Sequence, residues 1–150
     1  MPDTNRSLKA TASTKIEAAT PVVWQALVDP ELIKQYMFGT EVLTDWVEGS
    51  EIRWAGEWKG SKYEDKGKIL VVDPPHVLSF SHFSPLTGQP DVPENYHTVR
   101  IELLDEGQVT DVTLTQDNNH DDQARAHSEE NWQMMLDGLK TLVEAGGKSG

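Results

Sequence analysis

The stretch NWQMMLDGLKTLVE, residues 131–144, decides the fold of this 150-residue chain. Its large apolar side chains, such as Trp132, Leu136 and Leu139, recur at spacings of three and four residues, which places them on one face of a predicted helix. That face needs an apolar surface to pack against, and the strand-like sequence before it can form a sheet. The pattern therefore predicts a sheet that grips one long C-terminal helix. Such an architecture leaves room for a cavity, which makes ligand binding the first function to consider.

The composition excludes several classes of function. The chain has no cysteine, which rules out disulfides, thiolate metal sites and cysteine nucleophiles. Its formal net charge of -12 argues against nucleic acids and anionic membranes as partners, because both attract clustered Lys and Arg. The first residues lack the pattern of a signal peptide, and no apolar run approaches the ~20 residues that cross a bilayer. We therefore expect a cytoplasmic protein without a membrane partner.

The sequence predicts a single domain over residues 8–145, flanked by flexible tails at 1–7 and 146–150. A first strand is followed by two short helices, and then by six strands in which apolar and polar side chains alternate. The expected strands are 8–18, 41–47, 51–58, 63–72, 77–83, 96–104 and 109–117, and the short helices lie near 21–28 and 32–37. The connection 84–95, rich in proline, is too long for a tight turn and is expected at the rim of the cavity.

Two stretches resemble a known family. Residues 67–80, GKILVVDPPHVLSF, and 132–139, WQMMLDGL, are similar to one branch of the START and birch-pollen-allergen (SRPBCC) superfamily. That branch is named after the C-terminal domain of the activator of heat-shock protein 90 ATPase, and the likeness runs from about residue 14 to residue 144. The resemblance implies an α+β helix-grip fold, in which a curved antiparallel sheet (strand, two short helices, six strands) wraps around a long C-terminal helix and encloses a cavity.

The resemblance also implies three kinds of function. The first is binding of a lipid-like or polyketide-like molecule. The second is an enzyme like the polyketide cyclases and aromatases of the wider superfamily. The third is stimulation of the ATPase of a chaperone partner, with a role in the stress response.

Strand alternation predicts which side chains face the helix. A tight turn near Gly60 is expected to pair Trp58 with Tyr63 and Trp54 with Gly67, where the glycine leaves room for the indole. All of these aromatic side chains then belong to the inner face, so one part of the cavity wall is predicted to be aromatic.

The same alternation predicts a polar end of the inner face. His82 and His97 are expected to lie directly opposite each other, with Gln116 beside His97 and Asp65 on a neighbouring strand. Two imidazoles, a carboxylate and an amide could serve acid–base chemistry or recognition of a polar group. The alternative is a wetted rim, where polar side chains only meet water.

These faces define the candidate site. The expected ligand-binding residues are Trp54, Trp58, Tyr63, Phe80, His82, His97, Val99, Gln116, Trp132, Met135 and Leu139. The candidate catalytic residues, under the enzyme hypothesis alone, are His82 or His97 as proton shuttle and Asp65 as the group that orients it.

The other chemistries find little support. His120 and His127 are seven positions apart, which misses the spacing that brings two metal ligands to one helical face. No nucleophile elbow, phosphate loop or dinucleotide fingerprint occurs, so we expect neither a metal nor a cofactor. The leading hypothesis is a protein that binds a small, largely hydrophobic or aromatic molecule, and we expect this function more than an enzyme. We expect the protein to be a monomer or a weak dimer.

Overall fold

The computed structural model describes residues 8–58, 60–85 and 88–149, without the side chains of residues 58 and 147–149. Its elements follow one another in the order that the sequence predicts. They are β1 (Ala10–Ile16), α1 (Thr20–Val28), α2 (Pro30–Tyr36), β2 (Glu41–Leu43), β3 (Glu51–Trp58), β4 (Ser61–Asp73), β5 (Val77–His82), the 3-10 turn η3 (Pro93–Asn95), β6 (His97–Asp105), β7 (Thr110–Gln116) and α3 (Asp122–Ser149).

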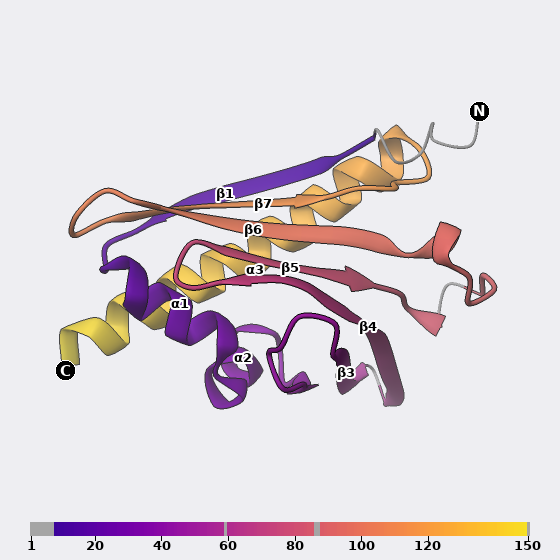
Figure 1. The fold of residues 1–150 in the computed structure, drawn as a ribbon, viewed down its shortest axis with the longest axis horizontal. Coiled ribbons are helices and arrows are strands. Elements are labelled where there is room, and N and C mark those ends of the chain that lie inside the picture. Colours follow the sequence, from indigo (N-terminus) through magenta and orange to yellow (C-terminus); the bar gives the residue numbers. More distant parts are fainter. Residues whose placement is uncertain (1–7, 59, 86–87, 150) are drawn as a thin grey trace.

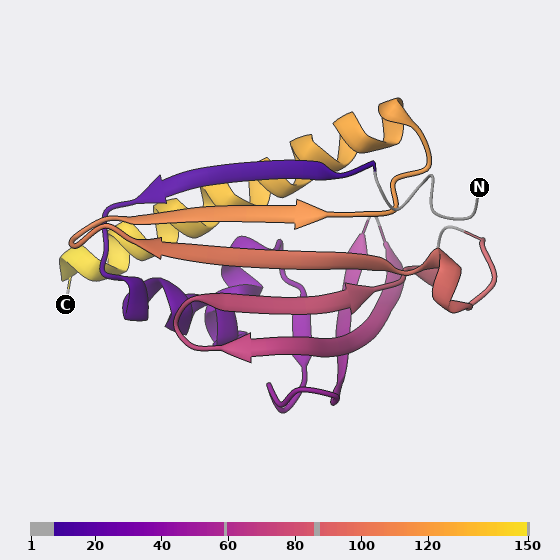
Figure 2. The same cartoon turned by 45° about the horizontal axis from the view of Figure 1, so that its top comes forward.

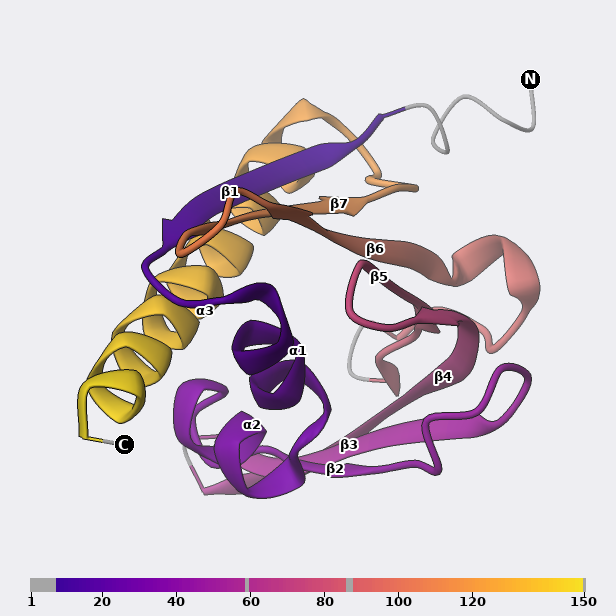
Figure 3. The ribbon, with the colours of Figure 1, turned by 60° about the vertical axis from the view of Figure 1, so that its left-hand side comes forward.

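Within the described residues, seven strands form one antiparallel sheet in the order β1-β7-β6-β5-β4-β3-β2. The sheet curves around helix α3, which runs along its concave face (Figures 1 and 2). The short helices α1 and α2 contact α3 and close the space between it and the β2–β3 end of the sheet (Figure 3). This arrangement confirms the α+β helix-grip fold. No helix in the described part of the chain is long and apolar enough to cross a membrane.

The core lies between the sheet and α3. Trp54, Phe80 and Val99 were expected on the inner face, and all three are buried in one cluster with Leu114 and Leu139. The predicted helix face is therefore correct, because the residues that recur every three or four positions on α3 point into this cluster.

Helix α3 is longer than its apolar pattern predicts. It begins at Asp122, because the side chain of Asp121 accepts a hydrogen bond from the N–H of Ala124 at 2.8 Å and satisfies one of the open donors of the first turn. Arg125 pairs with Asp122 and Glu129 and supports this polar first part. At its other end the helix continues to Ser149, so residues 146–149, which the sequence placed in a tail, are helical. The expected tail at 1–7 lies outside the described residues.

The polar edge of α3 protects the outer edge of β1. A strand at the edge of a sheet exposes backbone N–H and C=O groups that can pair with another chain. Here side chains four or more residues apart on α3 bind these groups instead. The bonds join Thr11 N to Glu129, Ser13 N and O to Gln133, Lys15 O to Lys140, and Glu17 N to Glu144.

The strand register differs from the prediction by two residues in two hairpins. The β3–β4 turn is tighter than expected, so that Trp58 pairs with Ser61 and Trp54 with Asp65. The β6–β7 turn is longer, and Val99 pairs with Gln116. A shift by two leaves every side chain on the same face of the sheet, which is why the predicted inner face survives the error. The expected strand 41–47 is also too long, since β2 ends at residue 43.

Gly67 is needed for a reason other than the predicted one. It pairs with Ile52 and does not face Trp54. A Cβ at this position would lie 1.8 Å from the carbonyl oxygen of Ser81 on β5, so only a residue without a side chain allows the two backbones to approach this closely. The register of β4 against β5 shifts just beyond this point, between Ile69 and Val71.

Candidate functional site

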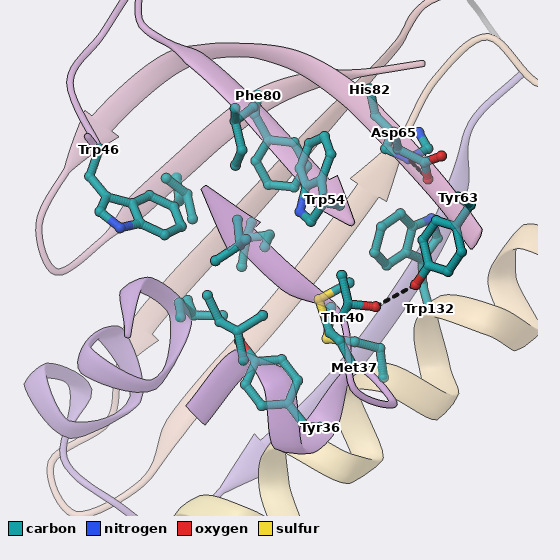
Figure 4. Close-up of a pocket in the computed structure, with 17 residues that line it drawn as sticks. Tyr36, Met37, Thr40, Trp46, Trp54, Tyr63, Asp65, Phe80, His82 and Trp132 are labelled. Carbon is teal, nitrogen blue, oxygen red and sulfur yellow. Dashed lines mark hydrogen bonds and ion pairs between the residues drawn. The ribbon is translucent and has the colours of Figure 1, made fainter. Parts of the chain in front are cut away.

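A cavity of about 100 Å³, here called the inner chamber, lies between the sheet, α2 and α3 (Figure 4). Its walls are mostly aromatic and aliphatic, with a polar group at one end. The aromatic lining residues are Tyr36, Trp46, Trp54, Tyr63, Phe80 and Trp132; the aliphatic and sulfur-containing ones are Leu27, Ile33, Met37, Val42, Ile52, Leu78, Ile101 and Met135; the polar ones are Thr40, Asp65 and His82. Mostly apolar walls with a few convergent polar groups are typical of sites for small molecules.

The inner chamber adjoins a second hollow of about 390 Å³, here called the outer recess. His97, Gln116 and Phe38 line the outer recess but not the chamber. The residues common to both hollows form the boundary between them, and they are Met37, Thr40, Tyr63, His82, Trp132 and Met135. A molecule held in the chamber could therefore extend into the recess past this boundary.

Trp54 is the centre of the aromatic wall. Its ring centroid lies 5.2 Å from that of Phe80 in a tilted arrangement, and 5.1 Å from that of His82, which it meets edge on. Trp54 lies on β3, whereas Phe80 and His82 both lie on β5, and β4 runs between these two strands in the sheet. Tilted and edge-to-face contacts of this kind are the arrangements that aromatic rings prefer.

Asp65 and His82 form a hydrogen-bonded pair at the polar end of the chamber. An isolated bridge pairs Lys66 with Phe83. Asp65 and His82 each precede one of these residues, and successive side chains of a strand point to opposite faces, so both point toward the helix. The Nε2 atom of His82 lies 2.9 Å from Oδ2 of Asp65. A carboxylate only accepts, so Nε2–H is the donor. The other oxygen, Oδ1, is buried and has no hydrogen-bond partner among the described residues.

A second polar contact lines the same chamber. The hydroxyls of Thr40 and Tyr63 are 2.6 Å apart (Figure 4). Thr40 follows α2 and Tyr63 lies on β4, so the bond joins the helical layer to the sheet across the chamber. One hydroxyl hydrogen lies between the two oxygens, and the other is available to a further acceptor.

His97 belongs to a network at the outer recess. Its ring is nearly parallel to that of His82, with 6.3 Å between the centroids, and the two residues pair across β5 and β6 as the sequence predicts. The indole N–H of Trp132 donates to Oε1 of Gln116, which directs the Gln116 amide nitrogen toward Nδ1 of His97 at 3.1 Å. Helix α3 is thereby connected to β6 and β7 through side chains.

Most of the predicted site residues line one of the two hollows. Trp54, Tyr63, Asp65, Phe80, His82, Trp132 and Met135 line the inner chamber, and His97 and Gln116 line the outer recess. Val99 and Leu139 are fully buried in the core and line neither hollow. The side chain of Trp58 lies outside the described part of the structure.

The contribution of α2 and of the segment after β2 to the chamber was not predicted from the sequence. Met37 directly follows α2 and belonged to the predicted helix 32–37, whereas Thr40 lies beyond it, where no periodic pattern places it. Trp46 has a positive φ of 58°, which takes the chain out of the strand direction and brings the indole to the chamber. The hydroxyl of Tyr36 donates to Ala26 O at 2.9 Å, and burial raises the pKa of this phenol well above its ordinary value of 10.0. The spacing of apolar residues in α2 was the one available signal for Tyr36.

The described residues contain no group of His, Asp and Glu side chains that could hold a metal ion, so His120 and His127 do not form one with their described neighbours.

The fold and the cavity define the class of protein: a helix-grip domain of the SRPBCC superfamily. The model of the family described as "Activator of Hsp90 ATPase homolog 1-like protein" matches residues 17–144, and the chain belongs to this family. A search of curated proteins found no match.

Several solved structures are similar. ChR145 from Cytophaga hutchinsonii is 54% identical, with a TM-score of 0.81 over 93% of this chain and 96% of that one. The Aha1 dimer from Colwellia psychrerythraea is 21% identical, with a TM-score of 0.72 over 92% of this chain and 97% of that one. CalU16 from Micromonospora echinospora is 24% identical, with a TM-score of 0.67 over 91% of this chain and 76% of that one. The last two likenesses support the fold alone.

Proposed function

We propose that this protein binds a small, largely apolar aromatic molecule between its sheet and helix α3. The observation that carries the proposal is the inner chamber, whose aromatic walls meet a polar group at one end and open toward the outer recess. The ring pair of Trp54 and Phe80 offers a flat apolar surface, and the thioethers of Met37 and Met135 can adapt to different shapes. The outer recess would take the more polar part of the ligand.

Tryptophan fluorescence tests this proposal, because Trp46, Trp54 and Trp132 all line the chamber. Titration with toluene and with naphthalene should change the emission in a saturable way. Substituting the buried chamber residue Val42→Phe fills the space and should abolish the change, whereas Val47→Phe, on an exposed side chain, should not. Binding that survives Val42→Phe would locate the ligand elsewhere, and no response to any apolar probe would refute the proposal.

An enzyme is the second candidate, favoured by the 2.9 Å contact between Asp65 and His82. Asp65 holds the ring so that Nε2 carries the proton, which leaves Nδ1 of a neutral His82 as the basic atom. His82 would then remove a proton from a carbon next to a carbonyl group of the ligand and return it later. Solvent deuterium exchange into 2-tetralone, followed by NMR, tests this role. His82→Gln should abolish any exchange that the wild-type protein accelerates, and no acceleration by the wild type counts against the enzyme.

A protein partner is the third candidate. The description of the family names the ATPase of heat-shock protein 90, and the solved relative from Colwellia psychrerythraea is a dimer. Stimulation of a chaperone ATPase by the purified protein would support this role, and size-exclusion chromatography with light scattering would measure its oligomeric state. A cytoplasmic location and a role in the stress response remain predictions.

A further inference from the structure

One hydrogen bond crosses the boundary between the inner chamber and the outer recess. Thr40 and Tyr63 each line both hollows, and their hydroxyl oxygens are 2.6 Å apart (Figure 4). Thr40 is buried where the chain enters β2, and Tyr63 lies on β4, so the bond reaches over β3, which runs between these two strands. A molecule that moves from the recess into the chamber along this path must separate the two hydroxyls.

Gly56 on β3 gives the side chain of Tyr63 the room to make this bond. The two residues pair across β3 and β4, and a Cβ at position 56 would lie 2.5 Å from the phenol oxygen of Tyr63. The phenol therefore lies directly over the glycine. Thr40 meets it there, because the next residue, Glu41, pairs with Ala55 beside Gly56. The position of Tyr63 in this bond thus depends on a residue without a side chain.

The surroundings of the bond allow movement. Met37 and Met135 also belong to the boundary, and their unbranched side chains with three rotatable bonds adapt to a passing molecule. Thr40 follows two residues with positive φ, Phe38 at 57° and Gly39 at 88°. A bulky residue seldom adopts this conformation, and the side chain of Phe38 is 68% exposed, so little packing holds it there. Strained backbone of this kind is common in ligand clamps and switch segments.

We propose that the hydrogen bond between Thr40 and Tyr63 is a gate that controls entry to the inner chamber. When the bond breaks, the phenol swings away from Gly56 and the turn 37–40 moves, while the sheet and α3 stay in place. A single hydrogen bond between neutral groups is strong enough to favour the closed gate and weak enough to break for each entry. This inference rests on the proposed function, because it concerns access to the same cavity.

Tyr63→Phe and Thr40→Val each remove the bond with little change in the shape of the side chain. Line shapes of fluorobenzene in 19F NMR, recorded over a titration, give its dissociation constant and both rate constants. In each variant the association rate constant should rise about fivefold, since the loss of one hydrogen bond of ordinary strength makes the open gate more populated. The double variant should bind no faster than either single variant, because both substitutions remove the same bond.

Tyr96→Phe is the matched control. Its hydroxyl donates to Oδ1 of Asp91, also at 2.6 Å, and neither residue lines the chamber or the recess. Loss of a bond of the same length at this place should leave both rate constants of fluorobenzene unchanged.

The rate constants separate a gate from a contact to the ligand. An unchanged association rate constant in either single variant, if thermal unfolding shows it to be folded, would overturn the gate while ligand binding itself stands. A change in the dissociation rate constant alone would do the same, because the hydroxyls would then only contact the bound molecule. Rate increases that multiply in the double variant would also overturn the gate, since the two hydroxyls would act independently. No binding of fluorobenzene by the wild type or by any variant would contradict the proposed function as well.

Discussion

Substitution of Gly67 by alanine should open the sheet next to the candidate site. The added Cβ would meet the carbonyl oxygen of Ser81 at 1.8 Å, and an ordinary contact needs at least 3.4 Å. The backbones of β4 and β5 must therefore separate by about 1.6 Å, because neither contacting atom belongs to a flexible side chain.

Three hydrogen bonds span this part of the β4–β5 pair. Lys66 and Phe83 exchange two backbone bonds, of 3.0 and 2.8 Å, and Lys68 N donates to the Ser81 hydroxyl at 2.9 Å. At about 1 kcal/mol net for each, their loss should lower the free energy of unfolding by about 3 kcal/mol. For a domain of this length that corresponds to a melting temperature lower by about 6–12 °C.

Differential scanning calorimetry measures this change, and Gly146→Ala is the matched control. Gly146 lies in α3, and a Cβ there meets nothing within 4 Å. The same substitution should therefore stabilise the protein by up to about 1 kcal/mol, because alanine is the better helix former. If Gly67→Ala left the melting temperature unchanged or raised it, the close approach of the two strands would be wrong, and with it the position of Asp65 against His82.

Further predictions concern the core, the buried phenol and the protected edge. Leu139→Ala should lower the free energy of unfolding by about 2–5 kcal/mol, whereas Leu104→Ala, on an exposed side chain, should change it by at most about 0.5 kcal/mol; urea unfolding of both variants is the check. Burial raises the pKa of Tyr36 above its unfolded value of 10.0, so the protonated hydroxyl stabilises the fold below pH 10 and this contribution should be lost as the pH rises beyond it. Between pH 8 and 12, the free energy of unfolding should fall less with rising pH in Tyr36→Phe than in the wild type. Identical slopes of this free energy against pH in the two proteins would tell against the buried phenol. The double substitution of Glu129 and Gln133 by alanine exposes the edge of β1 and should promote self-association. A variant that light scattering shows to be monomeric at high concentration would contradict the protective role of α3.

The inner face of the sheet was predictable because side chains alternate with a period of two. An error of two residues in register therefore left Trp54 and Val99 on the correct face. The opposition of His82 and His97 was also predicted correctly, and this prediction did not depend on the length of the connection between their strands. The register itself depended on turn lengths that alternation does not determine.

Other parts of the site had no signal in the sequence. Trp46 reaches the chamber through a positive φ, a conformation that a tryptophan seldom adopts and that no pattern announces. The bond between Thr40 and Tyr63 joins two segments whose relative position depends on the packing of α2. The true constraint on Gly67 is a close approach of two backbones, which only the three-dimensional structure reveals.

The central claim is that an aromatic molecule occupies the space between the sheet and α3. Methyl NMR of protein labelled with 13C at the methionine methyl groups tests it most directly, because Met37 and Met135 line the inner chamber whereas the neighbouring Met134 is exposed. Titration with 4-methylphenol should shift the signals of Met37 and Met135 along one common saturation curve and leave that of Met134 in place. Shifts confined to Met134, or no saturable shift at either chamber methionine, would contradict the claim.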